Sequence, residues 1–408
     1  MFLQHPRESR VAIGTAPIPA AGQDGRTEPE HGWEWLGLVG MTEPPRPGVK
    51  DALALAHRAG IRTIMLTGDQ PATAAALARE LDLAAGRAPR VLFGSQAPVA
   101  DVDVYARATP EGKFQLVQAL QRSGQQVGLT GDGVHDAPAL RAADAGIALG
   151  RSTEVAKAAA ALILADESLP TLLAGVAEGR AVFRNLQKAL DYLLSCSLAT
   201  VLAALITMAV GNPPILLPLQ ILYLNLLMHT FPAFGLTRER ASLDLLQRAP
   251  PRREALLSPT RLAAILWHGT IIAIAAVAIG AWGLHHEGAA HGRSLAFATL
   301  ATALLLHAFS DRSPRPFRGW AAWRNPTLLG CVVVALALQL LALYLPALRS
   351  LLMMTHFTPA DWLGVLAAAA GSVLAVELSK WTWPQEGPEA EQAGMAPAPP
   401  ESQSDAQR

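Results

Sequence analysis

Residues 130–150, TGDGVHDAPALRAADAGIALG, give the clearest indication of the fold of this 408-residue chain. A short apolar run, QQVGL, precedes the Thr-Gly-Asp-Gly loop, and an alanine-rich stretch typical of a helix follows it. Asp132 and Asp136 lie on this loop, where two hard oxygen ligands suit Mg²⁺ with bound phosphate. The stretch therefore predicts a strand, a ligand-binding loop and a helix in succession.

The same alternation extends from about residue 48 to residue 164. It predicts a parallel, doubly wound α/β domain, in which ligands bind beyond the carboxyl ends of the strands. Both Thr-Gly-Asp loops, beginning at Thr67 and Thr130, fall at such ends. We expect helices at DALALAHRAG, PATAAALARELDL, EGKFQLVQALQRSG and DAPALRAADAG, and strands at IRTIMLTGD, QQVGLTGDGV, IALG and ALILA.

Two more side chains complete the predicted site. Thr67 offers a hydroxyl beside backbone N–H groups that can hold phosphoryl oxygens, and Lys113 opens a helix from which it can reach the same place. Threonine, lysine and paired aspartates are the groups that stabilise a phosphoryl group during transfer. Each alone has a structural alternative, such as a capping threonine, a solvated lysine or a turn aspartate. Their common location at strand ends favours the functional interpretation.

The second half of the chain is apolar enough to cross a bilayer repeatedly, at roughly 20 residues for each span. Six spans in succession predict an all-α membrane domain and make the lipid bilayer a partner. The fourth is the shortest. The expected spans are approximately Leu190–Val210, Ile215–Phe234, Leu262–Trp282, Leu295–Phe309, Leu328–Leu348 and Trp362–Glu377.

Arginine distribution predicts the orientation of these spans, because cytoplasmic loops carry an excess of Lys and Arg. The N-terminal domain and the tail from Pro384, which we expect to be disordered, should both be cytoplasmic. Lys plus Arg and Asp plus Glu number 33 each, and no basic cluster occurs elsewhere, which argues against a nucleic-acid partner. The arginines in question are Arg238, Arg240, Arg248, Arg252 and Arg253 after the second span, and Arg312, Arg315, Arg318 and Arg324 after the fourth.

Several segments, in order, resemble the calcium-pump-like P-type cation-transporting ATPases (E1-E2 ATPases), whose phosphorylation domain is of the haloacid-dehalogenase class. TGDGVHDAPALRAADAGIALG is similar to their hinge motif, MLTGDQPATA to their second phosphate loop, and ARATPEGKFQLVQALQ to the segment with their phosphate-binding lysine. GLVGMTEPPRP resembles their Asp-Pro-Pro-Arg hinge, with Glu43 in place of the aspartate, and SRVAIGTAPIP resembles the end of their nucleotide-binding domain. The run from TEVAKAAAALILADESLP to ALDYLLS resembles the passage into their fifth membrane helix.

This resemblance implies a domain order and a plasma (inner) membrane location. Residues 1–40 would be a remnant of the nucleotide-binding domain and hinge, and residues 41–178 the C-terminal part of the phosphorylation domain. Residues 179–383 would form the membrane domain, and residues 384–408 the tail.

The resemblance also implies roles for individual residues, with Mg²⁺ and ATP as cofactors. Asp132 would bind the catalytic Mg²⁺, and Asp136 would support the phosphorylation site. His135 stands where the family usually has asparagine, and its larger ring alters that loop. The implied catalytic residues are Thr67, Gly68, Asp69, Lys113, Asp132 and Asp136, and those near the cofactor are Glu43, Arg46, Gly131, Gly133 and His135.

The chain lacks the family's Asp-Lys-Thr-Gly-Thr motif, which contains the phosphorylated aspartate. We therefore expect the C-terminal portion of a pump, inactive alone, with the remainder lost, omitted by a misassigned start, or supplied by another polypeptide. The alternative is a catalytically inactive, pump-derived membrane protein with a binding or regulatory role. Asp101 and Asp103 in DVDVY resemble the Asp-x-Asp nucleophile of related phosphatases. We expect a solvent-exposed turn there, because SQAPVA is a poor strand.

In the membrane domain the resemblance points to a possible ion path with few carboxylates. Ser197 and Thr200 occupy positions of asparagine and glutamate in the calcium pumps, and Asn225 is retained. Met228 and His229 replace threonine and aspartate, and Leu304 replaces the ligand of the eighth helix. Such a site should bind Ca²⁺ weakly. One-turn spacing predicts that Asn225 and His229 share a helix face, where His229 either serves transport or bonds a neighbouring helix.

Overall fold

The computed structural model describes residues 9–15, 34–41, 45–94, 101–166, 168–239, 243–247, 256–312 and 325–382. The chain divides into two compact units. The first comprises Met1–Ala177 and Leu243–Ala249, and the second comprises Glu178–Ser242 and Pro250–Arg408.

The first unit is an α/β domain, as predicted. Strands β3, β5 and β4 form one parallel sheet in that order, and β6, β7 and β8 form another. Strands β1 and β2 form an antiparallel pair. The strands are β1 (Ser9–Thr15), β2 (Glu34–Met41), β3 (Met65–Leu66), β4 (Val91–Phe93), β5 (Val104–Ala106), β6 (Gly128–Gly131), β7 (Ala145–Leu149) and β8 (Leu162–Leu164). The helices are α1 (Val49–Arg58), α2 (Pro71–Glu80), α3 (Pro110–Arg122), α4 (Ala137–Ala142) and α5 (Glu154–Ala159), with short 3₁₀ turns η1 (Val134–Asp136) and η3 (Leu243–Leu246).

Helix α3 shows how local sequence fixes these elements. The Thr109 hydroxyl accepts a hydrogen bond from the Gly112 N–H at 3.1 Å, and Pro110 occupies the first turn, where no N–H is needed. The helix then buries Leu116 and Val117. These residues share one core cluster with Leu66 of β3 and Leu129 of β6, so both sheets contribute to the same hydrophobic core.

The predicted solvent-exposed turn at DVDVY is wrong. Val102 and Val104 are completely buried, and β5 begins at Val104 and pairs with both β3 and β4. Asp103 is also buried, because Arg87 donates two hydrogen bonds to its carboxylate at 2.8 and 2.7 Å. Only Asp101 is exposed, with 79% of its side chain accessible. An arginine outside the motif thus allows a carboxylate to be buried beside the strand.

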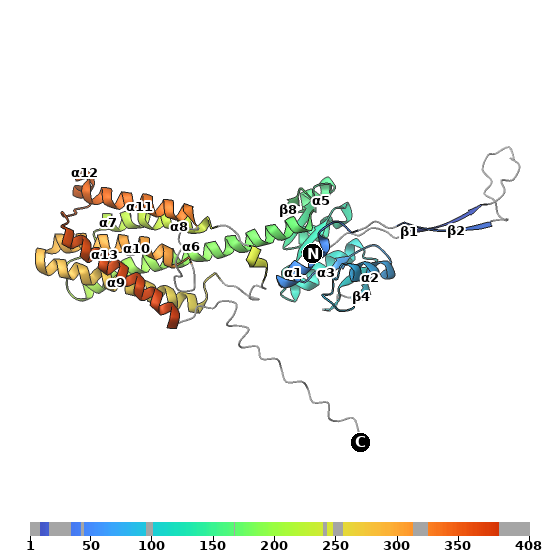
Figure 1. Ribbon diagram of the computed structural model, residues 1–408, viewed down its shortest axis with the longest axis horizontal. Helices are drawn as coiled ribbons and strands as arrows, with labels where there is room; N and C mark the ends of the chain where they lie inside the picture. Colours follow the sequence, from blue (N-terminus) through green and yellow to red (C-terminus); the bar gives the residue numbers. More distant parts are fainter. Residues whose placement is uncertain are drawn as a thin grey trace, which may run out of the picture. The chain divides into compact units, whose positions relative to one another are not determined.

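The second unit is helical and contains the six predicted apolar spans, by length and composition. Helix α10 is the most enclosed and packs against α9 and α13 (Figure 1). Its limits are wider than expected, and the fifth span ends earlier, before Pro346 begins a separate short helix. The elements are α6 (Leu169–Ala209, which starts in the first unit), α7 (Pro218–Tyr223), the π-helix η2 (Leu224–His229), α8 (Thr230–Thr237), α9 (Pro259–Glu287), α10 (Ala289–Ser310), α11 (Pro326–Tyr344), α12 (Pro346–Leu351) and α13 (Pro359–Thr382).

Glycines allow α9 and α10 to approach closely. A Cβ placed on Gly292 would lie 2.5 Å from the carbonyl oxygen of Gly280, and one on Gly283 would lie 3.0 Å from the Cα of Gly292. Backbone atoms cannot give way as a flexible side chain can. These small residues therefore set the separation of the two helices, as is common between membrane helices.

Candidate functional site

Lys113 and Asp136 form the central contact of the candidate site. The Lys113 ammonium donates to Asp136 Oδ1 at 2.6 Å, and the side chains are 21% and 10% exposed. Lys113 lies in the first turn of α3, and Asp136 ends the 3₁₀ turn that follows β6. Two residues predicted separately at strand ends are therefore brought together.

The backbone of the TGDGVHD loop is shaped around Asp136. The N–H of Gly133 donates to Asp136 Oδ2 at 3.3 Å, while a Cβ on Gly131 would lie 2.7 Å from the Asp136 Cβ. Any larger residue at 131 would push against this aspartate. Gly131 and Gly133 thus have structural reasons for their presence in the loop.

The second loop, which contains Thr67, is attached to the end of β5. The Thr67 N–H donates to the carbonyl of Tyr105 at 3.0 Å, and the Thr67 carbonyl accepts from Ala108 at 2.8 Å. The Thr67 hydroxyl donates to Asp69 Oδ2 at 2.9 Å, which orients both side chains. Since Ala108 directly precedes the cap of α3, these bonds connect the Thr67 loop to the helix that contains Lys113.

Asp132 differs from its neighbours in the loop. Its backbone carbonyl accepts from the Thr153 N–H at 2.9 Å, but no hydrogen bond of its side chain occurs among the described residues. It is half-buried, so its carboxylate oxygens can reach a ligand. A half-buried carboxylate without a hydrogen-bond partner among the described residues fits one of the hard oxygen ligands of a phosphate-bound Mg²⁺.

The remaining predicted residues of this unit have less defined surroundings. Gly68 has open space where a Cβ would lie, which leaves its backbone accessible. Arg46 and His135 are exposed, and Glu43 lies outside the described residues.

Ser152 and Thr153 support the loop and were missed by sequence reasoning. The Ser152 hydroxyl donates to the Gly131 carbonyl at 3.3 Å and accepts from the Leu149 N–H at 2.8 Å. Together with the Thr153 bond to Asp132, these contacts hold the loop from the end of the neighbouring strand. The signal in the sequence was a polar pair directly after a strand, at the sheet edge where the site lies.

Comparison with known proteins agrees with this architecture. Residues 213–382 match the family described as "Cation transporting ATPase, C-terminus", and residues 10–144 match the haloacid dehalogenase-like hydrolases. The calcium-transporting ATPase of Bacillus subtilis (strain 168) is 33% identical over 374 residues, covering 88% of this chain. The chain belongs to the P-type cation-transporting ATPases.

Two further relatives extend the similarity. Calcium-transporting ATPase 1 of Lactococcus lactis is 34% identical over 358 residues, covering 85% of this chain, and the endoplasmic reticulum calcium ATPase srcA of Aspergillus fumigatus is 31% identical over 399 residues, covering 86%. This P-type ATPase chain spans only 42%, 40% and 41% of the length of the three relatives, respectively. P-type ATPases generally use Mg²⁺ and ATP.

The predicted ion-path residues of this P-type ATPase chain do not share one environment. Ser197 and Asn225 are exposed, whereas Thr200 and His229 are buried. Asn225 and His229 therefore differ in exposure, and their shared helix face stays a prediction. Residues 224–229 form a π-helix rather than an α-helix, and the Thr230 hydroxyl bonds the Asn225 carbonyl five residues back, at 3.3 Å.

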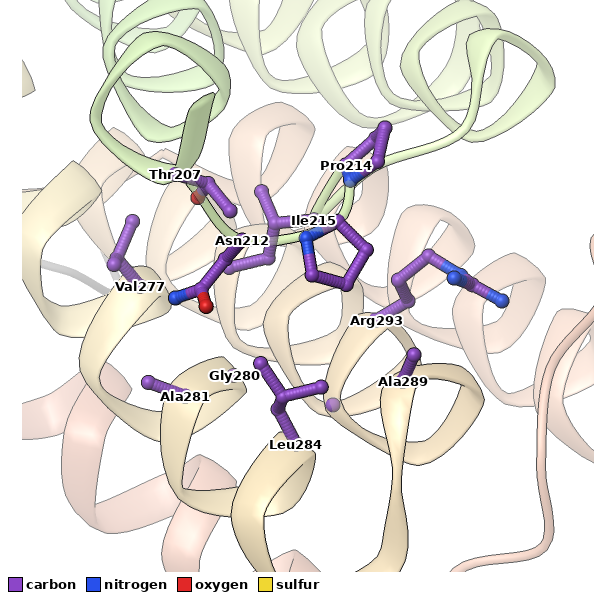
Figure 2. A pocket seen from close by; sticks show the side chains of 12 residues that line it. Thr207, Asn212, Pro214, Ile215, Val277, Gly280, Ala281, Leu284, Ala289 and Arg293 are labelled. Atoms are coloured by element: carbon purple, nitrogen blue, oxygen red, sulfur yellow. The ribbon is translucent and has the colours of Figure 1, made fainter. Parts of the chain in front are cut away.

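The π-helix also changes the polar contacts of this span. The Tyr192 hydroxyl of α6 donates to the Met228 carbonyl at 3.1 Å. The buried His229 Nε2 has no hydrogen-bond partner among the described residues. Leu304 is completely buried in α10, which leaves no oxygen ligand at that position. A separate hollow, lined by Asn212, Gly280 and Arg293 among others, lies in the same helical unit and contains none of the predicted site residues (Figure 2).

Proposed function

We propose that this chain forms part of an ATP-driven cation pump, in which its loops hold Mg²⁺ and the transferred phosphoryl group. The pairing of Lys113 with Asp136 beside the accessible Asp132 carboxylate supports the proposal. Lys113 would neutralise phosphoryl oxygens, the Thr67 hydroxyl and the Gly68 backbone would position them, and Asp132 would hold the metal. Bound Mg²⁺ would supply charge stabilisation during phosphoryl transfer. Glu43, Arg46 and His135 would act near the nucleotide.

A separate segment must supply the phosphorylated aspartate, because the chain has no Asp-Lys-Thr-Gly-Thr motif. The sheets offer a place for such a segment. Strand β3 pairs only with β5, and β6 only with β7, among the described residues. Both strands belong to one core, so a further parallel strand inserted between them would place its carboxyl end beside both phosphate loops.

The transported ion would pass through the helical unit. The relatives are named as calcium-transporting ATPases, which supports a cation as cargo. The predicted path contains hydroxyl, amide and imidazole groups but no carboxylate, so Ca²⁺ would bind weakly there. We propose that His229 serves the path, because an ionisable group inside a membrane is a functional candidate and its Nε2 has no hydrogen-bond partner among the described residues. In a pump completed by the missing part, His229→Leu should abolish ion-stimulated turnover.

Complementation tests the proposal directly. The chain would be purified alone, and also after co-expression with the N-terminal part of the Bacillus subtilis relative that precedes the matched region. Vanadate-sensitive ATP hydrolysis should be absent from the chain alone and present in the complex. Asp132→Asn in the complex should abolish it, whereas Asp51→Asn, an exposed aspartate on α1, should not.

The outcomes separate the two candidate functions. ATP hydrolysis by the chain alone would refute our proposal that a separate segment supplies the aspartate. A stable complex without hydrolysis would favour the inactive binding or regulatory protein, for which the missing acceptor motif is the supporting observation.

A further inference from the structure

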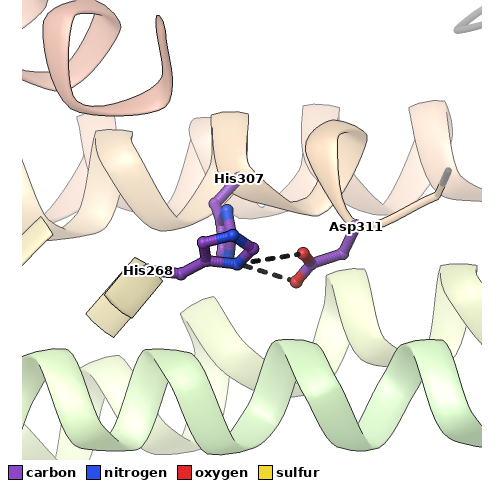
Figure 3. A group of neighbouring side chains, drawn as sticks. All are labelled: His268, His307 and Asp311. Atoms are coloured by element: carbon purple, nitrogen blue, oxygen red, sulfur yellow. Dashed lines mark ion pairs between the residues drawn. The ribbon is translucent and has the colours of Figure 1, made fainter. Parts of the chain in front are cut away.

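Two histidines and an aspartate form an enclosed group in the helical unit (Figure 3). His268 lies in the first half of α9, His307 lies near the end of α10, and Asp311 directly follows that helix. The side chains of His268, His307 and Asp311 are 8%, 0% and 7% exposed. From this group we propose a binding site for a divalent transition metal of the Zn²⁺ class, which we call the His-His-Asp site.

The distances suit a small metal ion. One ligand atom from each residue lies within 4.8 Å of the other two. Asp311 Oδ2 lies 3.1 Å from His307 Nε2, and Asp311 Oδ1 lies 4.0 Å from His268 Nδ1. Ligand atoms around tetrahedral Zn²⁺ lie about 3.3–3.6 Å apart, given metal–ligand distances of about 2.0–2.2 Å. A small movement of the His268 ring would therefore close the site, leaving a fourth position for water.

The group contains buried polar atoms that the protein leaves unsatisfied. His307 Nδ1 and Asp311 Oδ2 have no hydrogen-bond partner among the described residues, although Oδ2 is near the His307 ring. Whichever nitrogen bears the proton, one ring position of His307 remains buried without a partner. A buried polar atom without a partner is destabilising. A bound cation would accept lone pairs from the carboxylate and from an imidazole nitrogen.

The ring nitrogen of His307 that faces Asp311 has a second contact. His307 Nε2 also lies 3.1 Å from the Ser195 hydroxyl on α6. That hydroxyl can release the nitrogen to a metal, because it can also donate to the Asp191 carbonyl at 2.7 Å or the Tyr192 carbonyl at 3.0 Å. Because α9 and α10 pack closely through their glycines, the backbone that supports two of the ligands is also constrained.

The charges near the His-His-Asp site leave it net negative. The nearby buried ammonium, Lys380 on α13, donates to Glu377 Oε1 and to the Ser310 carbonyl, both at 2.7 Å. The positive charge of Lys380 is thus balanced by Glu377. The two neutral imidazoles of His268 and His307 add no charge. One carboxylate remains to attract a dication. Two imidazoles and one carboxylate favour Zn²⁺, Co²⁺ or Ni²⁺ over Ca²⁺, which requires six to eight oxygen ligands.

A second group in the same unit provides a contrast. Glu287, His291 and Asp361 are similarly close to one another. However, His291 contacts the Thr355 hydroxyl at 2.9 Å and Asp361 at 3.1 Å, and Asp361 Oδ2 accepts two bonds from Thr358 at 2.7 and 2.8 Å. Neither ring nitrogen of His291 is left without a partner. We therefore interpret this second group as a structural hydrogen-bond network, and it serves as a control for metal binding at the His-His-Asp site.

Titration with Co²⁺ tests the proposal on the full chain, purified in detergent without a histidine tag. Wild-type protein should bind one equivalent with the intense visible band of four-coordinate Co²⁺, and Zn²⁺ should displace it. His268→Gln and Asp311→Asn should each weaken binding by more than roughly 100-fold, beyond the range typical for supporting residues. Glu287→Gln and the double variant His285→Gln/His286→Gln should retain the band.

Thermal unfolding provides a second readout that needs no activity. Zn²⁺ should raise the unfolding midpoint of the wild type but not of Asp311→Asn. The proposal is overturned if wild-type protein shows no such band, a result that does not depend on the folding of any variant. It is also overturned if the band persists in His268→Gln and Asp311→Asn, or disappears in the variant without the two exposed histidines. None of these measurements depends on pump activity, so they are independent of the proposed function.

Discussion

Lys113 and Asp136, 23 residues apart in sequence, form a charged contact of 2.6 Å between the first turn of α3 and the end of the turn after β6. Lys113→Met would leave a mostly buried carboxylate without its cation. Hydrogen bonds to charged groups contribute about 1.5–3 kcal/mol, so we expect a loss of that order. In a double-mutant cycle with Asp136→Asn, the double variant should lose less than the sum of the two single losses. Denaturant unfolding monitored by tryptophan fluorescence would measure this, and additive losses would contradict a direct interaction.

Asp132 should affect metal binding without affecting folding, because its side chain makes no hydrogen bond among the described residues. We expect Asp132→Asn to reduce the affinity for Mn²⁺, used as a paramagnetic substitute for Mg²⁺, by tenfold or more. A tenfold loss corresponds to about 1.4 kcal/mol of binding free energy. The unfolding midpoint should remain within the error of the wild type. Asp51→Asn is the matched control, and equal Mn²⁺ affinity in the two variants would remove Asp132 as the ligand.

The two Thr-Gly-Asp loops could be predicted because their signals are local. A strand, a glycine and an aspartate in sequence place Thr67 and Asp132 at the carboxyl ends of their strands without any knowledge of distant residues. Burial of Asp103 could not be predicted in this way, because it depends on Arg87, which is 16 residues away and precedes the strand. The π-helix at residues 224–229 was missed because the apolar pattern of the span was read as a continuous α-helix.

The His-His-Asp site was missed for the same reason as the Asp103 pairing. His307 and Asp311 are four residues apart and visibly share a helix face, but His268 comes from the preceding helix. Only the packing of α9 against α10 brings the three together. Pairs within an element are thus accessible to sequence reasoning, whereas groups assembled across elements require the fold.

The contact between Arg87 and Asp103 predicts a structural role for Asp103. Asp103→Asn should weaken both hydrogen bonds from Arg87, because the buried side chain at position 103 would no longer carry the negative charge that attracts the guanidinium. We expect stability to fall by about 1–3 kcal/mol. Asp101→Asn, at a site 79% exposed, should change stability by less than about 0.5 kcal/mol. Denaturant midpoints of the two variants would test this difference. Equal stability in the two variants would mean that Asp103 is not needed for the strand.

The close approach of α9 and α10 makes Gly292 sensitive to substitution. Gly292→Ala would place a methyl group 2.5 Å from the Gly280 carbonyl, so the helices must separate, which typically costs about 1–3 kcal/mol. Gly330→Ala on α11 is the control, because no atom lies within 4 Å of its added Cβ. At that position the unfolding midpoint should stay the same or rise slightly, because alanine has a better helix propensity than glycine. Thermal unfolding midpoints in detergent would show the contrast, and similar midpoints for both variants would contradict the packing.

Glu239, which follows α8, should make stability depend on pH. Partial burial raises the pKa of its carboxyl, but hydrogen bonds and charges from Lys188 and Arg312 outweigh this, so the pKa is lower than usual. A lowered folded-state pKa stabilises the protein above the unfolded value of about 4.3, and this contribution is lost as pH falls through the folded-state pKa. Glu239→Gln should therefore be less stable than wild type at pH 7, and the difference should shrink as pH falls below about 4. Unfolding midpoints of both proteins between pH 7 and pH 3 would test this, and a constant difference across that range would show that the carboxylate charge is not responsible.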